Sequence, residues 1–506
     1  MTNAVAPAGL PPFRAIPDLI HENALARPSH LALRCGAGRL TWQQLDAAVN
    51  RIAATLQARG VQPRQAIAIC GANSIPYVLL FLGGLRAGLA VAPLPTGATA
   101  QQLAGMVEDS GARFLFADAA VPAFEAGVPR IRMDDAAQLE AWLQAGARPQ
   151  PVAIEPDWAF NIIYSSGTTG TPKGIVQPHR MRWAHVARGE NYGYGADAVT
   201  MVATSLCSNT TLVSALPCLA KGGTLVLTEG RFDPRAYLEL AQDARATHAM
   251  LVPVQYQRLM ACPEFDRYDL SSFRMKFCTS APFSATLKAQ VLARWPGGLV
   301  EYYGMTEGGG TCILEAHKFP DKLHTVGQPA EGHDIRLLDE QGHEVAPGEA
   351  GEVVGRSASM MTGYQNQPAK TREAEWFDAA GNRFIRTGDV GRFDADGFLV
   401  LMDRRKDMII SGGFNVYPSD LEAVLRGHPA VHEVAVIGVP SEAWGESPVA
   451  FVVPNEGAPA PEELRSWANE RVGKIQRLAD LRYLPELPRS DIGKVLKRQL
   501  RDGYTG

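Results

Sequence analysis

The chain has 506 residues, enough for more than one domain, and its 46% hydrophobic and 20% charged content is ordinary for a soluble globular enzyme. A net charge of −4 offers no basic field for nucleic acid. The seven cysteines are scattered without a Cys-x-x-Cys pair, and the histidines lack metal-ligand spacing. We therefore expect reduced, mostly buried thiols in a cytoplasmic protein, without a disulfide framework or a zinc site. Residues 1–12 have no basic region and do not resemble a signal peptide.

Strand-like runs alternate with helix-like segments between residues 41 and 303. Helical patterns include 41–59 and 234–246, and the strand-like runs are 66–70, 90–93, 113–117, 158–164, 200–204, 224–228, 249–253, 276–278 and 299–303. This alternation predicts parallel α/β layers, in which ligands bind at the carboxyl ends of the strands. The most apolar stretch, 75–94, is interrupted by Pro76, Arg86 and glycines, so we expect a buried helix and a strand there, not a membrane span.

The pattern of predicted secondary structure changes towards the C-terminus. Residues 325–400 look β-rich, and the charged run 403–407 is either a solvated turn or an interdomain linker. Beyond it we expect helices near 419–426, 461–472 and 494–501, and strands near 434–439 and 449–453. The sequence therefore predicts an α/β protein: a large N-terminal domain (1–402) with a β-rich subdomain, a hinge (403–406), and a small, mobile α+β C-terminal domain (407–506).

One segment after the strand-like run 158–164 is rich in glycine, hydroxyl groups and one lysine. Glycines let the backbone turn and aim several N–H groups at one anion, hydroxyls add donors, and a lysine adds positive charge. We therefore expect a phosphate-binding loop, not a flexible surface loop. It is not a Walker A motif, because Lys173 follows Pro172 and precedes Gly174. The candidate phosphate-binding residues are Ser165, Ser166, Gly167, Thr168, Thr169, Gly170 and Lys173.

This order of residues resembles the signature loop of the acyl-adenylate-forming superfamily, and further motifs follow in that family's order. The segment Tyr302-Tyr303-Gly304-Met305-Thr306-Glu307 resembles the Y-G-x-T-E motif. The resemblance implies that Tyr303, beside Tyr302 and Gly304, stacks on adenine. It also implies that Thr306 touches the α-phosphate and that Glu307 holds Mg²⁺, for which a carboxylate is suited.

Two more motifs resemble nucleotide-binding segments of the family. Ser280-Ala281-Pro282 resembles a motif that lines the adenine and acyl pockets, although relatives often have glycine at one of the first two positions. Arg386-Thr387-Gly388-Asp389 resembles the T-G-D motif, whose aspartate binds the ribose hydroxyls, and Arg404 corresponds to an arginine that assists at the nucleotide.

The last motifs belong to the C-terminal region. By resemblance, Lys406 is the hinge residue, and Gly412-Gly413 lets the narrow pantetheine chain of coenzyme A pass close to the backbone. Lys494, in the pattern Pro488 followed by Gly493-Lys494, corresponds to the catalytic lysine. We expect Lys497 and Arg498 to be solvated.

The resemblance implies an AMP-forming ligase of the acyl- and aryl-CoA synthetase branch, close to 4-coumarate and medium-chain acyl-CoA ligases. Such an enzyme condenses a carboxylate with ATP, releases pyrophosphate, and passes the acyl group from the adenylate to coenzyme A, with Mg²⁺. A stand-alone enzyme that loads an acyl carrier protein, and a non-catalytic nucleotide-binding relative, remain the alternatives. We expect no nucleic-acid partner and no membrane span, and homodimerisation is left open.

The acyl pocket departs from the family pattern. Around Cys207 many relatives carry an aromatic-His gate, which this chain lacks, and no acidic residue lies between 202 and 219 to hold an amino acid's ammonium group. Tyr302 would shorten the pocket and Gly308 would reopen space. We expect a small to medium aromatic, alicyclic or aliphatic acid. Some side chains of the helix after the loop are candidates to face it: Arg182, Trp183, His185 and Arg188.

Overall fold

The computed structural model describes residues 10–146, 148–165, 173–404, 407–411, 414–441, 444–473, 476–489 and 495–504, and in these ranges it leaves out the side chains of Ser165, Asp403, Arg404, Ile410, Phe414 and Asn415. The chain divides into two compact units. Unit 1 comprises residues 1–334 and 355–385, and unit 2 comprises residues 335–354 and 386–506. The expected domain division at 403–406 stays a prediction.

Two large sheets form the framework of unit 1, and both are mostly parallel. The seven-stranded sheet has the order β18 (Gly363–Tyr364), β8 (Lys173–Pro178), β7 (Ala159–Ser165), β4 (Ala90–Leu94), β3 (Ala66–Cys70), β5 (Ala112–Ala117), β6 (Arg130–Arg132). The nine-stranded sheet has the order β15 (Gln328–Pro329), β14 (Cys312–Glu315), β13 (Gly298–Tyr303), β12 (Met275–Cys278), β11 (His248–Leu251), β9 (Val199–Val202), β10 (Thr224–Leu227), β1 (Leu31–Cys35), β2 (Gly38–Thr41).

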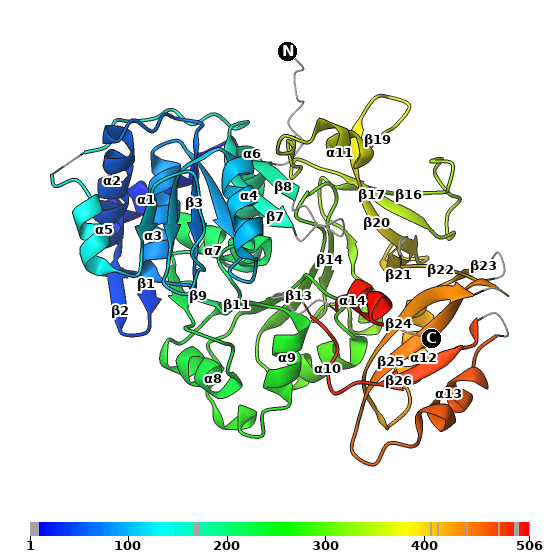
Figure 1. Cartoon of the computed structure of the whole chain (residues 1–506). Helices are drawn as coiled ribbons and strands as arrows, with labels where there is room; N and C mark the ends of the chain where they lie inside the picture. Colours follow the sequence, from blue (N-terminus) through cyan, green and yellow to red (C-terminus); the bar gives the residue numbers. More distant parts are fainter. Residues whose placement is uncertain are drawn as a thin grey trace. The chain divides into compact units, whose positions relative to one another are not determined.

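Helices cover the faces of these sheets (Figure 1). Unit 1 contains α1 (Ile16–Ala26), α2 (Trp42–Ala58), α3 (Ile75–Arg86), α4 (Ala100–Ser110), α5 (Ala136–Trp142), α6 (His179–Arg188), α7 (Asn209–Ala220), α8 (Pro234–Asp243), α9 (Pro253–Met260), α10 (Ala285–Arg294) and α11 (Pro368–Glu373), with the short 3-10 helices η1 (Gly189–Tyr192), η2 (Phe265–Arg267) and η3 (Pro320–Lys322).

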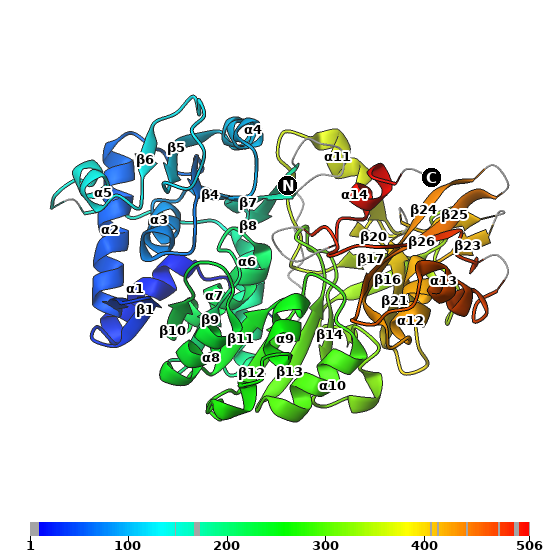
Figure 2. The ribbon, with the colours of Figure 1, turned by 60° about the horizontal axis from the view of Figure 1, so that its bottom comes forward.

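One continuous hydrophobic core joins the two sheets through the helices α2, α3, α6 and α7. Residues that alternate along a strand enter different cores: Ile69 of β3 packs in this shared core, whereas Cys70 packs against α4 on the other face. The opposite side of the nine-stranded sheet carries α8, α9 and α10, as Figure 2 shows. The parallel α/β layers predicted from the sequence are therefore confirmed, and each sheet has antiparallel strands at one edge at least.

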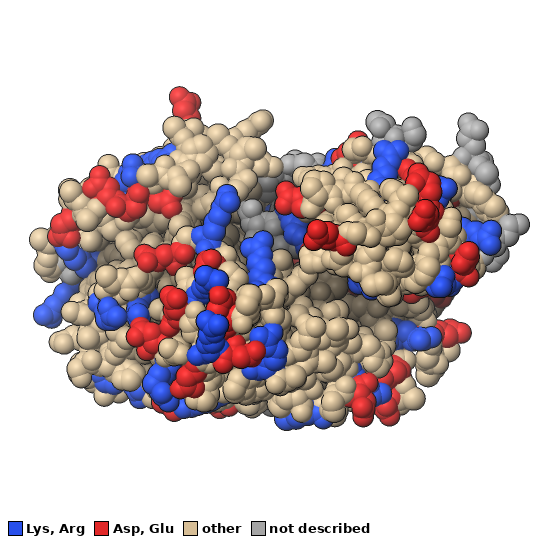
Figure 3. Space-filling model, turned by 90° about the horizontal axis from the view of Figure 1, so that it is seen from below, with Lys and Arg blue, Asp and Glu red and all other residues tan. Residues whose placement is uncertain are grey.

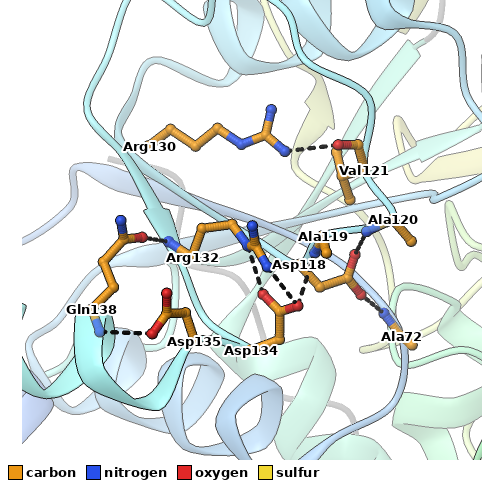
Figure 4. Close-up of polar contacts among 10 residues, drawn as sticks. All are labelled: Ala72, Asp118, Ala119, Ala120, Val121, Arg130, Arg132, Asp134, Asp135 and Gln138. Atoms are coloured by element: carbon orange, nitrogen blue, oxygen red, sulfur yellow. Dashed lines mark hydrogen bonds and ion pairs between the residues drawn. The ribbon is translucent and has the colours of Figure 1, made fainter.

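The loops at the carboxyl ends of the strands in the seven-stranded sheet are tied together by a carboxylate. Asp118 follows β5 and accepts the N–H groups of Ala72, after β3, and of Ala120 at 2.7 and 3.1 Å (Figure 4). Arg132 at the end of β6 pairs with Asp134, whose second role is to accept the N–H of Ala119. Backbone groups that lie beyond the sheet thus find side-chain acceptors.

Unit 2 contains two further sheets. In the first, β17 (Gly351–Arg356) is hydrogen-bonded to β16 (Asp334–Leu338) and β20 (Arg383–Phe393), and β21 (Leu399–Arg404) pairs with β20. β19 (Glu375–Phe377) pairs with the first residues of β20, which belong to unit 1. The second sheet has the order β23 (Phe414–Val416), β22 (Ile409–Ser411), β25 (Gly445–Pro454), β24 (Val431–Ser441), with β26 (Asp480–Tyr483) beside β25.

Among the described residues, three helices cover the second sheet of unit 2. α12 (Pro418–Arg426) and α13 (Pro461–Asn469) pack on one face, and α14 (Lys497–Asp502) places Leu500 on the other. The β-rich region and the α+β C-terminal region expected from the sequence are both present. None of the helices in the described part of the chain has the length and apolar character needed to span a bilayer.

Several predicted boundaries shift by a few residues. β11 ends at Leu251, because Pro253 opens α9 at a position where a missing N–H costs no hydrogen bond. The described helix near the C-terminus begins at Lys497, later than the predicted 494. All seven cysteines are free, and five of them are buried, as expected. Acidic and basic side chains are interspersed on the face of the molecule in Figure 3.

Candidate active site

The glycine-rich segment joins two strands of a hairpin. β7 and β8 pair antiparallel, with Tyr164 opposite Gly174 and Ser165 opposite Lys173. The candidate residues Ser166, Gly167, Thr168, Thr169 and Gly170 lie outside the described residues. The residues on either side, Ser165 and Lys173, pair with each other, and Lys173 opens a strand, not a helix.

Lys173 and Glu307 are linked through Tyr364, which the sequence did not single out. The Tyr364 hydroxyl donates to Glu307 Oε1 at 2.8 Å. Lys173 Nζ lies 5.1 Å from the centre of the Tyr364 ring, a cation–π contact. Burial and the Glu307 carboxylate raise the pKa of the Tyr364 hydroxyl, so it remains a donor. The pairing of β18 with β8 brings Tyr364 to this position.

A buried polar network fixes the backbone at Thr306. Gln177 of β8 donates from Nε2 to the Thr306 carbonyl at 2.6 Å and to Asn209 Oδ1 at 3.3 Å. Arg182, which is fully buried, donates to Asn161 Oδ1 at 3.0 Å, to Asn209 Oδ1 at 2.9 Å and to Gln177 Oε1. Burial lowers the pKa of Arg182 to about 9, and its hydrogen-bond partners are neutral amides, with the Phe160 ring 5.9 Å from the guanidinium carbon. The network therefore holds the Thr306 loop and contains a positive charge that forms no ion pair with an acidic side chain among the described residues.

The end of β12 carries the predicted Ser280-Ala281-Pro282 motif. Ser280 has φ 82°, in the left-handed region that favours glycine. Its hydroxyl hydrogen-bonds that of Thr210 in the first turn of α7 at 2.5 Å. Ala281 is partly buried and Pro282 is exposed.

The two tyrosines of β13 point to opposite sides of the sheet, as strand geometry requires. Tyr302 stacks on Phe277 of β12, with ring centroids 5.6 Å apart and an interplanar angle of 11°. Tyr303 pairs across the strand with Cys312 and is partly accessible, and Gly304 is exposed. Tyr302 therefore packs in the aromatic core, and the role of Tyr303 as the adenine-stacking ring stays a prediction.

Gly308 and Cys207 were both predicted to line the acyl pocket. Gly308 has φ 75°, and a Cβ there would lie 1.9 Å from the Ser359 carbonyl oxygen, so this glycine permits close backbone packing. Cys207 precedes α7, and its sulfur lies 3.1 Å from the Ser205 hydroxyl. Their assignment to the pocket stays a prediction.

Unit 2 holds the remaining candidates. Asp389 of β20 lies opposite Arg404 of β21 in the antiparallel register, and Thr387 Oγ1 accepts the Asp389 N–H at 3.0 Å. The predicted ribose-binding carboxylate and nucleotide-assisting arginine are thus cross-strand neighbours. The predicted hinge residue Lys406, the coenzyme A residues Gly412 and Gly413 and the catalytic Lys494 lie outside the described residues.

The described residues on either side of 490–494 contact each other. Arg489 and Val495 form a β-bridge, and the Leu496 N–H donates to the Pro488 carbonyl at 2.8 Å. Lys497 was expected to be solvated, and this prediction is wrong. Its side chain is 18% exposed, and its Nζ lies 2.8 Å from Glu422 Oε1. Arg498 is 59% exposed, as expected.

The donor set at Glu307 is compatible with Mg²⁺. No cluster of three or more acidic, His or Cys side chains that could hold a metal occurs among the described residues. Mg²⁺ commonly takes one or two carboxylates and completes its shell with substrate phosphates and water. Glu307 has one oxygen engaged by Tyr364, and its other oxygen has no hydrogen bond or ion pair within the described part of the chain.

Tyr364, Gln177 and Asn209 were missed by the sequence analysis. Tyr364 follows Gly363 in a two-residue strand too short to give a periodic signal. Gln177 is a polar residue that follows the apolar residues Ile175 and Val176 in β8, which is a usable signal for a buried hydrogen-bonding role. Asn209 is the first residue of α7 and follows Ser208, so in the sequence it is typical of the start of a helix and gives no sign of a role in a polar network.

The sequence matches the AMP-binding enzyme family over residues 20–365 and the AMP-binding enzyme C-terminal domain over residues 420–494. It is 35% identical to a feruloyl-CoA synthase of Amycolatopsis sp, with 95% of this chain and 97% of that one covered. It is 30% identical to the fatty acid–[acyl-carrier-protein] ligase ScoC of Streptomyces coeruleorubidus, with 98% of each chain covered. The fold resembles o-succinylbenzoate CoA synthetase from Bacillus subtilis, solved with its acyl-adenylate intermediate, with a TM-score of 0.85, 28% identity and coverage of 98% and 100%.

The chain belongs to the AMP-binding enzyme family, as the order of its sequence motifs predicted. Within the acyl-adenylate-forming superfamily it falls in the acyl- and aryl-CoA synthetase branch.

Proposed function

We propose that this protein is an ATP-dependent carboxylic acid–CoA ligase that forms AMP and pyrophosphate and acts on aromatic acids. The observation that carries the proposal is the convergence of Lys173, Tyr364 and Glu307 beside the network-held Thr306, at the end of the β7–β8 hairpin where the two strands are connected. The feruloyl-CoA synthase relative supports an aromatic acid. A cytoplasmic location is part of the proposal.

In the first step the substrate carboxylate attacks the α-phosphate of ATP, forming the acyl adenylate and releasing pyrophosphate. Lys173 and the hydroxyls of the preceding loop bind the β- and γ-phosphates, and Thr306 donates its hydroxyl to the α-phosphate. Glu307 would hold Mg²⁺, which neutralises phosphate charge when bound. The buried Arg182 adds a fixed positive potential that favours the anionic reactants.

In the second step the thiol of coenzyme A attacks the acyl carbonyl, and AMP leaves. Asp389 and Arg404 retain the nucleotide through the ribose hydroxyls during both steps, in the roles proposed for them. Lys494 acts in adenylation. The C-terminal domain then rotates about Lys406, and Gly412-Gly413 leaves room beside the backbone for the pantetheine chain of coenzyme A during thioester formation. Replacing Lys406 with proline is expected to slow thioester formation more than pyrophosphate release, and an equal loss in both would contradict the hinge role.

A carrier protein is the second candidate acceptor, because one relative is a fatty acid–[acyl-carrier-protein] ligase. The two acceptors are separated by the dependence of product formation on coenzyme A. Lys494→Ala is expected to abolish pyrophosphate release, whereas Lys318→Ala, at a lysine 57% exposed and paired with Glu315, retains it. Unchanged release in Lys494→Ala would overturn the adenylation role.

A further inference from the structure

Arg188, at the end of α6, is a partly buried arginine. It forms no ion pair with any Asp or Glu among the described residues. Its Nη2 instead lies 2.6 Å from Nε2 of His333, which follows β15. Burial lowers the pKa of Arg188, and a guanidinium group nevertheless stays charged in proteins. Within the described part of the chain, no acidic side chain therefore balances this largely desolvated cation.

The contact between Arg188 and His333 joins two hydrogen-bond donors. His333 Nδ1 accepts the Thr311 N–H at 2.9 Å, so the proton of the neutral imidazole sits on Nε2. Burial, and the charge of Arg188, lower the pKa of His333 to about 3, which keeps the ring neutral. Turning the ring by 180° does not help, because it would place a C–H group against the Thr311 N–H. Both Nε2–H and the guanidinium N–H groups therefore lack an acceptor at this point.

The side chains around this pair are largely desolvated. Arg188, His185, Tyr302 and His333 each keep partial solvent accessibility, and burial shifts the pKa values of all four away from their ordinary values. Nδ1 of His185, one turn before Arg188, is buried without a hydrogen-bond partner.

Flat aromatic rings lie beside Arg188. Tyr302 and Tyr192 of η1 are close enough to influence its charge. Tyr302 stacks on Phe277, and Tyr192 contacts both edge-on, with centroids 6.1 and 5.5 Å away. Such rings can pack against a planar ring or a conjugated chain. Tyr302 is four residues before Thr306 on the same strand and loop, so these rings lie next to the proposed adenylation centre.

We propose that Arg188 and His333 bind an anionic oxygen group, a second carboxylate, carried by the planar acyl substrate at the end remote from its reacting carboxylate. One oxygen accepts from His333 Nε2–H and from the guanidinium group, which resolves the opposed donors and balances the charge. The inference rests on the proposed function for the position of the reacting carboxylate.

The test compares two acids that differ only in the second carboxylate, 4-carboxycinnamate and cinnamate. Wild-type protein is expected to use the diacid with a kcat/KM about tenfold or more above that of the monoacid. Arg188→Met is expected to lower this preference about 10- to 100-fold, mainly through KM, as for the loss of a charged hydrogen bond. Arg188→Lys should restore part of it, since the charge returns without the planar fork. Arg180→Met, on the same helix at an arginine paired with Asp157, should leave the preference unchanged.

A binding measurement separates this inference from the proposed function. Calorimetric titration of 4-carboxycinnamate into the free protein should show binding that Arg188→Met weakens. Removing an uncompensated cation should also leave the melting temperature of the free protein unchanged or raised. Equal binding of both acids, no binding of the diacid, or a lower melting temperature together with an unchanged preference would overturn the subsite. Binding of the diacid without pyrophosphate release would contradict only the proposed function and would leave the subsite standing.

Discussion

Removing the single hydroxyl of Tyr364 tests whether Glu307 is positioned to hold a metal ion. In Tyr364→Phe, Glu307 Oε1 loses the donor that now lies 2.8 Å away, while the ring and its contact with Lys173 remain. A hydrogen bond to a charged group contributes about 1.5–3 kcal/mol, which corresponds to about 10- to 100-fold. Losing a partner that orients a metal-holding carboxylate has an effect of similar size.

The assay is pyrophosphate release as a function of Mg²⁺ concentration, at saturating ATP and acid. The Mg²⁺ concentration for half-maximal release should rise about 10- to 100-fold in Tyr364→Phe. Tyr237→Phe is the matched control, because the Tyr237 hydroxyl is buried without a hydrogen-bond partner, so its removal should leave both Mg²⁺ dependence and stability intact. An unchanged Mg²⁺ dependence in Tyr364→Phe would refute the reasoning about Glu307.

Three further predictions concern stability. Burial lowers the pKa of His179 to about 4, so between pH 4 and the ordinary imidazole pKa near 6.5 only the unfolded chain binds this proton. The free energy of unfolding should therefore fall as the pH is lowered through this window, by at most about 3 kcal/mol from this residue. Urea titrations at several pH values should show a smaller fall in His179→Leu. Ser280 has a left-handed backbone conformation, which glycine adopts without strain and alanine does not. Ser280→Gly should therefore be about 1 kcal/mol more stable than Ser280→Ala in the same urea assay. The reverse order would show that the backbone at this position is not strained. Glu422→Gln should cost about 1–3 kcal/mol of thermal stability, because Lys497 and Arg426 lose their shared carboxylate. It should also slow pyrophosphate release by loosening the segment next to Lys494. Full activity of the variant would contradict this anchoring role.

The parallel layers could be predicted because buried strands such as 66–70 are short apolar runs between helical patterns, and the fold preserves that alternation. Glycine and hydroxyl chemistry likewise indicated the phosphate-binding loop. By contrast, the hairpin at that loop could not be foreseen, since an apolar strand after a loop looks the same whether it pairs parallel or antiparallel. Edge pairing depends on which strands become neighbours in space, and that is a tertiary property.

The site was predictable only where a residue's chemistry is visible in its own segment. Glu307 and Thr306 stand in a recognisable motif, but Tyr364 reaches Glu307 from a strand 57 positions later. Arg182 and Arg188 were noted as candidates on one helix, yet their different surroundings appear only in the structure: amide acceptors around Arg182, and a donor facing Arg188. Partners that are remote in sequence leave no local pattern to read.

The account is tested most directly by measuring ATP-dependent pyrophosphate release over a panel of aromatic, alicyclic and aliphatic acids, each with and without coenzyme A. We predict release with planar aromatic acids, together with a thioester that forms only when coenzyme A is present. Release without any coenzyme A thioester would contradict the CoA-ligase assignment in favour of carrier-protein loading, and absence of release with every acid would contradict adenylation itself.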